Sequence, residues 1–101
     1  MSIKSPEETR ESDVEKHLVK QVKRFRGEVR KLQWIGRNGA PDRAVMLNGV
    51  HLVELKRPGA EPKPHQVREH IRLRRQGVKI YVLDSIAAVD SFIGRICGAR
   101  V

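Results

Sequence analysis

The dipeptide Asn48-Gly49 is the feature that most constrains the fold of this chain, because it separates two segments with strand character, residues 43–46 and 50–56. Asparagine and glycine readily adopt the positive φ angles that tight hairpin turns require, so the pattern predicts two antiparallel strands. Side chains alternate along a strand, and the length of the turn therefore decides which residues of the two strands share a face.

Two turn lengths place Asp42 differently relative to Glu54. A two-residue turn pairs Asp42 with Leu55, so that Asp42 faces away from Glu54. A three-residue loop, residues 47–49, pairs Asp42 with Glu54 if Gly49 is left-handed within a bulge. If the two carboxylates act together, the sequence predicts the longer turn.

Helical periodicity begins near Ser12 and ends at Gly27. Four apolar residues fall on one stripe of this predicted helix: Val14, Leu18, Val22 and Phe25. Residues 1–10 show no periodicity and are expected to form a flexible leader. Residues 11–101 are expected to form a single domain, because a chain of 101 residues has room for one modest core.

The remaining segments predict further elements, namely a strand near 28–35, a helix over 64–76, a strand over 78–83 and a last helix capped by Asp84 or Ser85. The predicted order is α-β-β-β-α-β-α. This order predicts an α/β sandwich around a mixed sheet.

Charge points to a polyanionic partner, because 21 Lys and Arg residues against 12 Asp and Glu residues give a net charge of +9. Counterion release makes each contact with a phosphate contribute affinity, which favours nucleic acid. Charge that serves only solubility is the alternative. No apolar run approaches the roughly 18 residues that span a bilayer, and the N-terminus lacks a signal-peptide core. The lone Cys97 provides no disulfide framework, so an intracellular location is expected.

Pro41-Asp42 and the triplet Glu54-Leu55-Lys56 carry the chemistry. Two carboxylates and a lysine can hold a divalent cation beside a phosphodiester and position a water to attack it. Alternatively, these residues are exposed strand charges next to a turn. A Glu-x-Lys triplet alone is common, but its position opposite Pro-Asp in a basic α/β domain favours catalysis.

The chain from about residue 15 to residue 92 resembles the VRR-NUC branch of the PD-(D/E)xK nuclease superfamily. The resemblance rests on Asn-Gly-Ala-Pro-Asp-Arg at 38–43, Val-Glu-Leu-Lys-Arg-Pro-Gly at 53–59, Gln66, and Gly-Val-Lys-Ile-Tyr-Val-Leu at 77–83. It implies a restriction-endonuclease-like core with a mixed central sheet flanked by helices. The chain departs from the pattern at Lys63-Pro64-His65, where such proteins more often carry a serine or threonine cap, so the exact start of this helix stays open.

The resemblance also implies roles for individual residues. Asp42 and Glu54 are expected to be metal ligands, together with the backbone carbonyl of Leu55, and oxygen ligands of this kind suit Mg²⁺ or Mn²⁺. Lys56 is expected to orient the attacking water or help to deprotonate it. Gln66 is expected to form hydrogen bonds near the lysine and the scissile phosphate.

Glu15 has two interpretations. The resemblance makes it the superfamily's N-terminal acidic residue, which assists metal or water binding. The Ser12-x-x-Glu15 spacing instead fits a capping box that needs no chemistry.

Several basic and polar residues near the motifs are candidates for DNA contacts: Arg37, Asn38, Arg43, Arg57, Arg68 and Arg72. His65 and His70 are five residues apart, which suits one helical face poorly and favours surface or packing roles over metal binding. Trp34 could stack on a base, although packing in the core or a dimer interface is favoured.

The sequence therefore predicts an Mg²⁺- or Mn²⁺-dependent endonuclease that recognises DNA structure rather than DNA sequence, since no major-groove recognition module is apparent. Small members of the branch are similar to Holliday-junction resolvases, which implies a homodimer acting on branched DNA. Flap or nick cleavage, or a non-catalytic nucleic-acid-binding module on the same fold, are the alternatives. The expected location is the cytoplasm, including that of a phage-infected or prophage-bearing cell.

Overall fold

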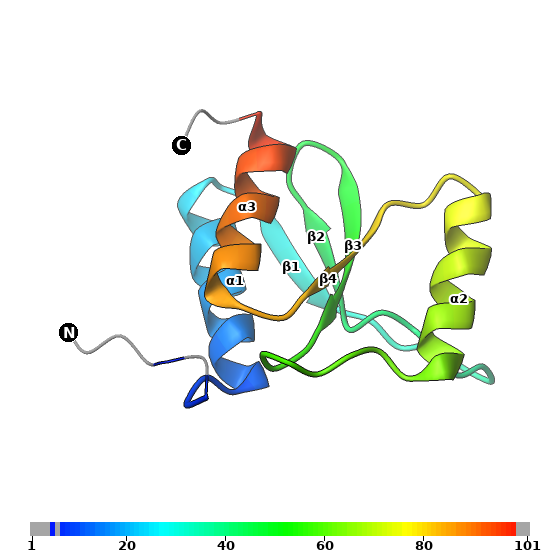
Figure 1. Cartoon of the computed structure of the whole chain (residues 1–101). Coiled ribbons are helices and arrows are strands. Elements are labelled where there is room, and N and C mark those ends of the chain that lie inside the picture. The colour runs from blue at the N-terminus through cyan, green and yellow to red at the C-terminus, as the bar shows by residue number, and fades with distance from the viewer. Residues whose placement is uncertain (1–4, 6, 99–101) are drawn as a thin grey trace.

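The structure of the chain is a computed structural model that describes residue 5 and residues 7–98. Its elements follow the order α-β-β-β-α-β-α (Figure 1), which confirms the predicted fold class. The expected leader lies partly outside the described residues. In its described part, the Thr9 side chain donates to the Ser5 carbonyl at 2.9 Å and so closes a turn. No helix in the described ranges is long and apolar enough to cross a membrane.

Four strands form one mixed sheet in the order β1-β2-β3-β4. They are β1 (Glu28–Lys31), β2 (Arg43–Met46), β3 (Val50–Leu55) and β4 (Ile80–Leu83). The pairs β1–β2 and β2–β3 are antiparallel, and β4 pairs with β3 in parallel. The parallel pair places the ends of β3 and β4 at the same edge of the sheet.

Three helices cover the sheet unequally, as Figure 1 shows. Helices α1 (Glu11–Arg24) and α3 (Ile86–Cys97) lie on one face, and α2 (Pro64–Arg75) lies on the other. The apolar core is formed between the sheet, α1 and α3 by a cluster of buried side chains: Val14, Leu18, Val22, Val45, Val53, Leu55, Leu83, Val89, Phe92, Ile93 and Ile96. This core fixes the strands whose ends carry the candidate site.

The turn between β2 and β3 is the longer one. Met46 pairs with Val50, which leaves residues 47–49 as a three-residue loop. Gly49 has a φ of 108° and Asn48 a φ of 50°, values that asparagine and glycine tolerate best. The predicted register is confirmed.

Helix α1 begins at Glu11, and its N-cap is Arg10. The Asp13 side chain accepts a hydrogen bond from the Arg10 backbone N–H at 2.9 Å. Ser12 is therefore inside the helix, and the predicted capping box of Ser12 and Glu15 is wrong. Asp13 lies three residues after the true N-cap, so it supplies the acceptor that the capping-box pattern assigned to Glu15.

Strand β1 ends at Lys31, four residues earlier than predicted. The Leu32 N–H still donates to the Asp42 carbonyl at 3.0 Å, and beyond this bond the chain leaves the sheet. At the other end of the chain, the Ser85 side chain accepts from the Ala88 N–H at 2.9 Å, so Ser85 caps α3.

Candidate active site

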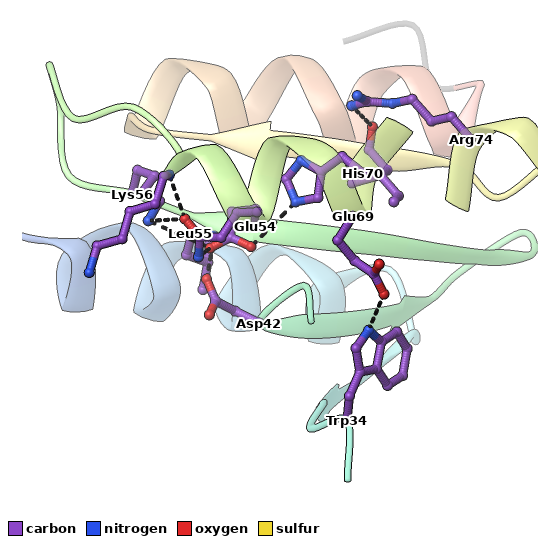
Figure 2. Close-up of polar contacts among 11 residues, drawn as sticks. Trp34, Asp42, Glu54, Leu55, Lys56, Glu69, His70 and Arg74 are labelled. Atoms are coloured by element: carbon purple, nitrogen blue, oxygen red, sulfur yellow. Dashed lines mark hydrogen bonds and ion pairs between the residues drawn. The ribbon is translucent and has the colours of Figure 1, made fainter. Parts of the chain in front are cut away.

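The end of the β2–β3 hairpin opposite its turn brings two carboxylates together. Arg43 pairs with Val53, so the next opposed pair is Asp42 and Glu54, and directly opposed residues project to the same side. The Asp42 side chain accepts a hydrogen bond from the Leu55 N–H at 2.7 Å (Figure 2). Glu54 is 1% exposed, although it is a carboxylate on the face that α2 covers.

Gln66 connects the carboxylate, the lysine and the start of α2. Its Nε2 donates to Glu54 Oε2 at 2.8 Å, and its Oε1 accepts from Lys56 Nζ at 3.0 Å. The same Oε1 accepts from the Lys63 N–H at 2.8 Å. Gln66 therefore satisfies the first turn of the helix, which is why α2 begins at Pro64 without a serine or threonine cap. Lys56 Nζ lies 3.7 Å from Glu54 Oε2, which completes a chain of polar contacts.

His70 is the site neighbour that sequence reasoning missed. Its Nε2 lies 3.5 Å from Glu54 Oε1, and its side chain is 3% exposed. Both atoms are buried and neither has a hydrogen-bond partner within the described part of the chain. Figure 2 shows the His70 ring directed toward Glu54. The spacing between His65 and His70 suggested a surface or packing role for His70. The spacing between Gln66 and His70 is the informative one, because residues four apart in a helix share a face.

The surroundings of Glu54 favour its protonated form. Burial, followed by the charge of Asp42, raises the pKa of Glu54 from an ordinary value of 4.5 to about 8, against the opposing effect of Lys56. Burial, followed by the charge of Arg74, lowers the pKa of His70, so its ring is neutral at pH 7. The charge of Asp42 thus disfavours a second negative charge on Glu54, and a cation beside the pair would offset this repulsion.

The donor chemistry of this pair fits a divalent cation. Glu54 Oε1 is a buried oxygen without a hydrogen-bond partner, and such an atom costs free energy unless it is paired or binds a metal. Carboxylate and carbonyl oxygens are the ligands that Mg²⁺ and Mn²⁺ prefer. No cluster of three or more His, Cys, Asp or Glu side chains able to hold a metal occurs in residues 5 and 7–98. The predicted set has only two such side chains, Asp42 and Glu54, and takes its third oxygen from Leu55.

A cavity of about 150 Å³ opens beside Asp42, between the hairpin and the start of α1, and it is lined by Glu11, Ser12, Glu15, Asp42, Arg43 and Leu55. Glu15 lies in this cavity but forms an ion pair with Arg43. Glu11 was not predicted, yet it lies one helical turn before Glu15, and its charge helps to raise the pKa of Glu54. The structure therefore offers two acidic residues on α1 beside the carboxylate pair.

The predicted DNA-contact residues divide into two groups. Arg37 and Arg72 bind the carboxylate of Glu69, and Arg43 binds Glu15. The other three have exposed side chains, namely Asn38, Arg57 and Arg68. Half of the candidates thus have a carboxylate partner, although the side chains of Arg37 and Arg72 are still 53% and 48% exposed.

Comparisons with known proteins bear on the family of the chain. No protein-family model matches the chain. A protein of Acyrthosiphon pisum secondary endosymbiont phage 1, named "Putative nuclease p44", is 49% identical over 78 residues, which make up 75% of this chain and 84% of that protein. A solved structure named "VRR_NUC domain" superposes with a TM-score of 0.78 at 40% identity, covering 84% of this chain and 95% of the other. With this identity over nearly the full length of both relatives, the chain belongs to the VRR-NUC family of nucleases.

Proposed function

We propose that this nuclease is a divalent-metal-dependent endonuclease that hydrolyses phosphodiester bonds in DNA and selects its substrate by structure. The observation that carries the proposal is the pairing of Asp42 with the buried Glu54 beside Lys56 and Gln66. A basic protein gains little fold stability from two adjacent carboxylates whose charges repel. A bound cation would offset this repulsion, which would explain why the two carboxylates lie side by side.

Each residue has a role that follows from its contacts. Lys56 Nζ is held by Gln66 at 3.0 Å, and its side chain is 14% exposed, so one end of the group can still reach solvent. There the neutral amine could accept a proton from an attacking water, and the ammonium that results could orient the hydroxide and offset negative charge that develops on the phosphate. Gln66 is a positioning residue, because it fixes both Lys56 and Glu54 through one side chain.

Asp42 and Glu54 would hold the cation, with the Leu55 carbonyl as a further oxygen and Glu11 or Glu15 available from α1. When bound, Mg²⁺ or Mn²⁺ supplies the positive charge that polarises the phosphodiester. Before it binds, the proton on Glu54 keeps the buried pair from carrying two negative charges. Binding of the cation would therefore release the proton from Glu54.

Branched DNA is the substrate class that we propose, with cleavage by a homodimer in the manner of a Holliday-junction resolvase. The chain carries a net charge of +9, which suits a polyanion. A twofold dimer would present two sites to two strands of a symmetric junction. Flap or nick cleavage by a single site is the second candidate.

A cleavage assay with four DNA structures tests these statements. Labelled four-way junction, flap, single-stranded and duplex DNA are incubated with Mn²⁺ and either the unaltered protein or Lys56→Ala. We expect symmetric paired nicks in the junction that disappear in the variant, while its circular dichroism and DNA affinity are retained. Failure to cut any substrate, with DNA binding intact, would favour a non-catalytic binding module.

A further inference from the structure

Glu69 on α2 is a buried carboxylate that accepts hydrogen bonds from two residues of the loop before Asp42 and from one residue of its own helix. Trp34 Nε1 donates to it at 2.8 Å (Figure 2), Arg37 contacts it at 3.0 Å, and Arg72 donates at 3.1 Å. Burial alone would raise the pKa of Glu69, but the hydrogen bonds from Arg37 and Arg72 outweigh burial and lower it. Glu69 is therefore ionised at neutral pH, and we call these four residues the Glu69 cluster.

The Glu69 cluster fixes the shape of the loop formed by residues 33–41. The Leu32 N–H and the Asp42 carbonyl meet at 3.0 Å, so the loop begins and ends beside the candidate site. Within the loop, Gly39 has a φ of +91°, and a Cβ there would lie 3.0 Å from both Glu69 Cβ and the His65 carbonyl. The loop is thus held at its base, at Trp34 and Arg37, and at the close approach of Gly39.

Ile35 lies on this loop, between the fixed Trp34 and the fixed Arg37, and it is 98% exposed. Single exposed aliphatic residues are common on protein surfaces and usually have no role. Here the flanking contacts hold the backbone in place, so the side chain cannot turn inward without breaking the Glu69 cluster. Three residues span at most about 11 Å, so Ile35 lies within a few base steps of the point where Leu32 meets Asp42.

The charge of α2, which contacts this loop through Glu69, favours DNA over a second copy of the chain as the partner, although Val67 and Ile71 of the helix are also exposed. Glu69 is the only acidic residue of α2, and it is buried in its cluster. The exposed surface of the helix carries the charges of Arg68, Arg72 and Arg75. A second copy would bring the same positive charges against these arginines, whereas a polyanion complements them.

We propose that Ile35 contacts the face of an unstacked base and thereby favours branched over continuous duplex DNA, an inference that rests on the proposed function. Apolar side chains insert between bases and unstack them, and a base at a branch point can be unstacked at a lower cost than a base inside a continuous duplex. Duplex DNA hides its base faces, so it would gain nothing from Ile35.

The test compares Ile35→Ala with Val50→Ala, a matched control that removes an exposed aliphatic side chain, 61% exposed, at the hairpin turn. kcat/KM is measured with Mn²⁺ on a four-way junction and on a duplex of the same arm sequences. Binding is measured with Ca²⁺ in place of Mn²⁺ to a junction with 2-aminopurine at the branch, whose fluorescence rises when the base unstacks. Sedimentation velocity gives the oligomeric state of each variant, and the emission of Trp34 shows whether the Glu69 cluster is intact.

We expect Ile35→Ala to lower kcat/KM on the junction by about tenfold or more, given the apolar area that the contact would bury, and to abolish the fluorescence rise. Duplex cleavage should change by less than about twofold, and Val50→Ala should match the unaltered protein throughout. Equal loss on both substrates, no loss on either, or a shift from dimer to monomer would overturn the assignment. If the unaltered protein cuts no DNA, the proposed function fails, and the fluorescence arm in Ca²⁺ still decides whether Ile35 meets a base.

Discussion

The two faces of the sheet bury different chemistry. Toward α1 and α3 the strands present apolar side chains such as Val45 and Val53, both fully buried. Toward α2 the hairpin presents the buried Glu54, and the two buried residues of α2 are Glu69 and His70. One face is an apolar core, and the other, which also buries Ala44 and Ile80, carries polar side chains held by specific contacts.

Because of this difference between the two faces, substitutions that change stability and substitutions that change function should lie on opposite sides of the sheet. Apolar burial contributes stability without regard to direction, so the core side tolerates changes that conserve volume. A buried polar layer depends on each partner, because an unpaired polar group costs free energy that hydration would otherwise provide. Substitutions on the two faces should therefore differ in kind: core changes should alter stability, and changes at the α2 face should alter metal binding and cleavage.

Glu54→Gln gives the largest expected effect, a loss of cleavage in a protein that stays folded. The amide has the shape of the protonated carboxyl but cannot bind a cation as a carboxylate does, so the cleavage rate should fall by about 10³-fold or more. Single-turnover cleavage of labelled junction DNA with Mn²⁺ measures the loss, and urea unfolding checks the fold. A variant that is unfolded, or one that retains more than about a tenth of the rate, would contradict the separation of the two faces.

Leu18→Ala tests the opposite face. This side chain is fully buried between α1 and the sheet, so its truncation should lower the free energy of unfolding by about 2–5 kcal/mol. Cleavage per folded molecule should stay within about twofold at a temperature where the variant is folded. Lys20→Ala, an exposed position on the same helix, serves as the control and should change neither quantity. A specific loss of cleavage in folded Leu18→Ala would show that the core also shapes the site.

The pH dependence of stability should report the Glu54 pair directly. The folded pKa of Glu54 is about 8 against an ordinary value of 4.5, so the folded protein holds a proton that the unfolded chain has released between these values. The contribution of Glu54 to stability is therefore present below pH 4.5 and is lost as pH rises toward 8, at up to about 1.4 kcal/mol per pH unit.

Urea unfolding of the metal-free protein at several pH values measures this slope, with Glu54→Gln as the reference without a titrating group. The difference between the two proteins should grow in favour of the variant as pH rises to 8. Saturating Mn²⁺ should reverse the difference, because the cation replaces the proton on Glu54 and stabilises the unaltered protein but not the variant. A constant difference across this range would mean that Glu54 is not the buried acid described here.

Much of the core face and of the carboxylate pair could be predicted from sequence, because both follow from local periodicity. The predicted stripe identified the buried side of α1, because Val14, Leu18 and Val22 are fully buried, but its fourth member, Phe25, is the C-cap and is 37% exposed. The alternation of side chains required a three-residue turn for Asp42 to oppose Glu54, and the observed register has it. These features depend only on residues that are close in sequence or joined by a tight turn.

The polar layer was harder to predict because its partners lie far apart in the chain. Trp34 and Glu69 are separated by 35 residues, and no periodicity links them. The early end of β1 follows from that contact, since the chain turns away from the sheet to reach α2. The capping pattern at Ser12 was also wrong, because Asp13 offered an equivalent acceptor to a different N-cap. Polar contacts are specified by pairs of residues, and a single sequence does not show which pairs form.

His70 gives the smallest expected effect and the sharpest test of the polar layer. Its Nε2 lies 3.5 Å from Glu54 Oε1, on the side of the carboxylate opposite Gln66, so it should orient Glu54 without touching the substrate. His70→Phe keeps the volume but removes the ring nitrogen, and Mn²⁺ affinity measured by calorimetry should weaken by about tenfold, as for other residues that orient ligands.

His65→Phe, at an exposed position on the same helix, should leave Mn²⁺ affinity unchanged. If His70→Phe were to alter stability but not Mn²⁺ affinity, His70 would be a packing residue, and the polar layer would act on the metal through Gln66 alone. If affinity falls while stability holds, the face of the sheet toward α2 is organised for binding a cation, because a purely structural layer would lose stability first.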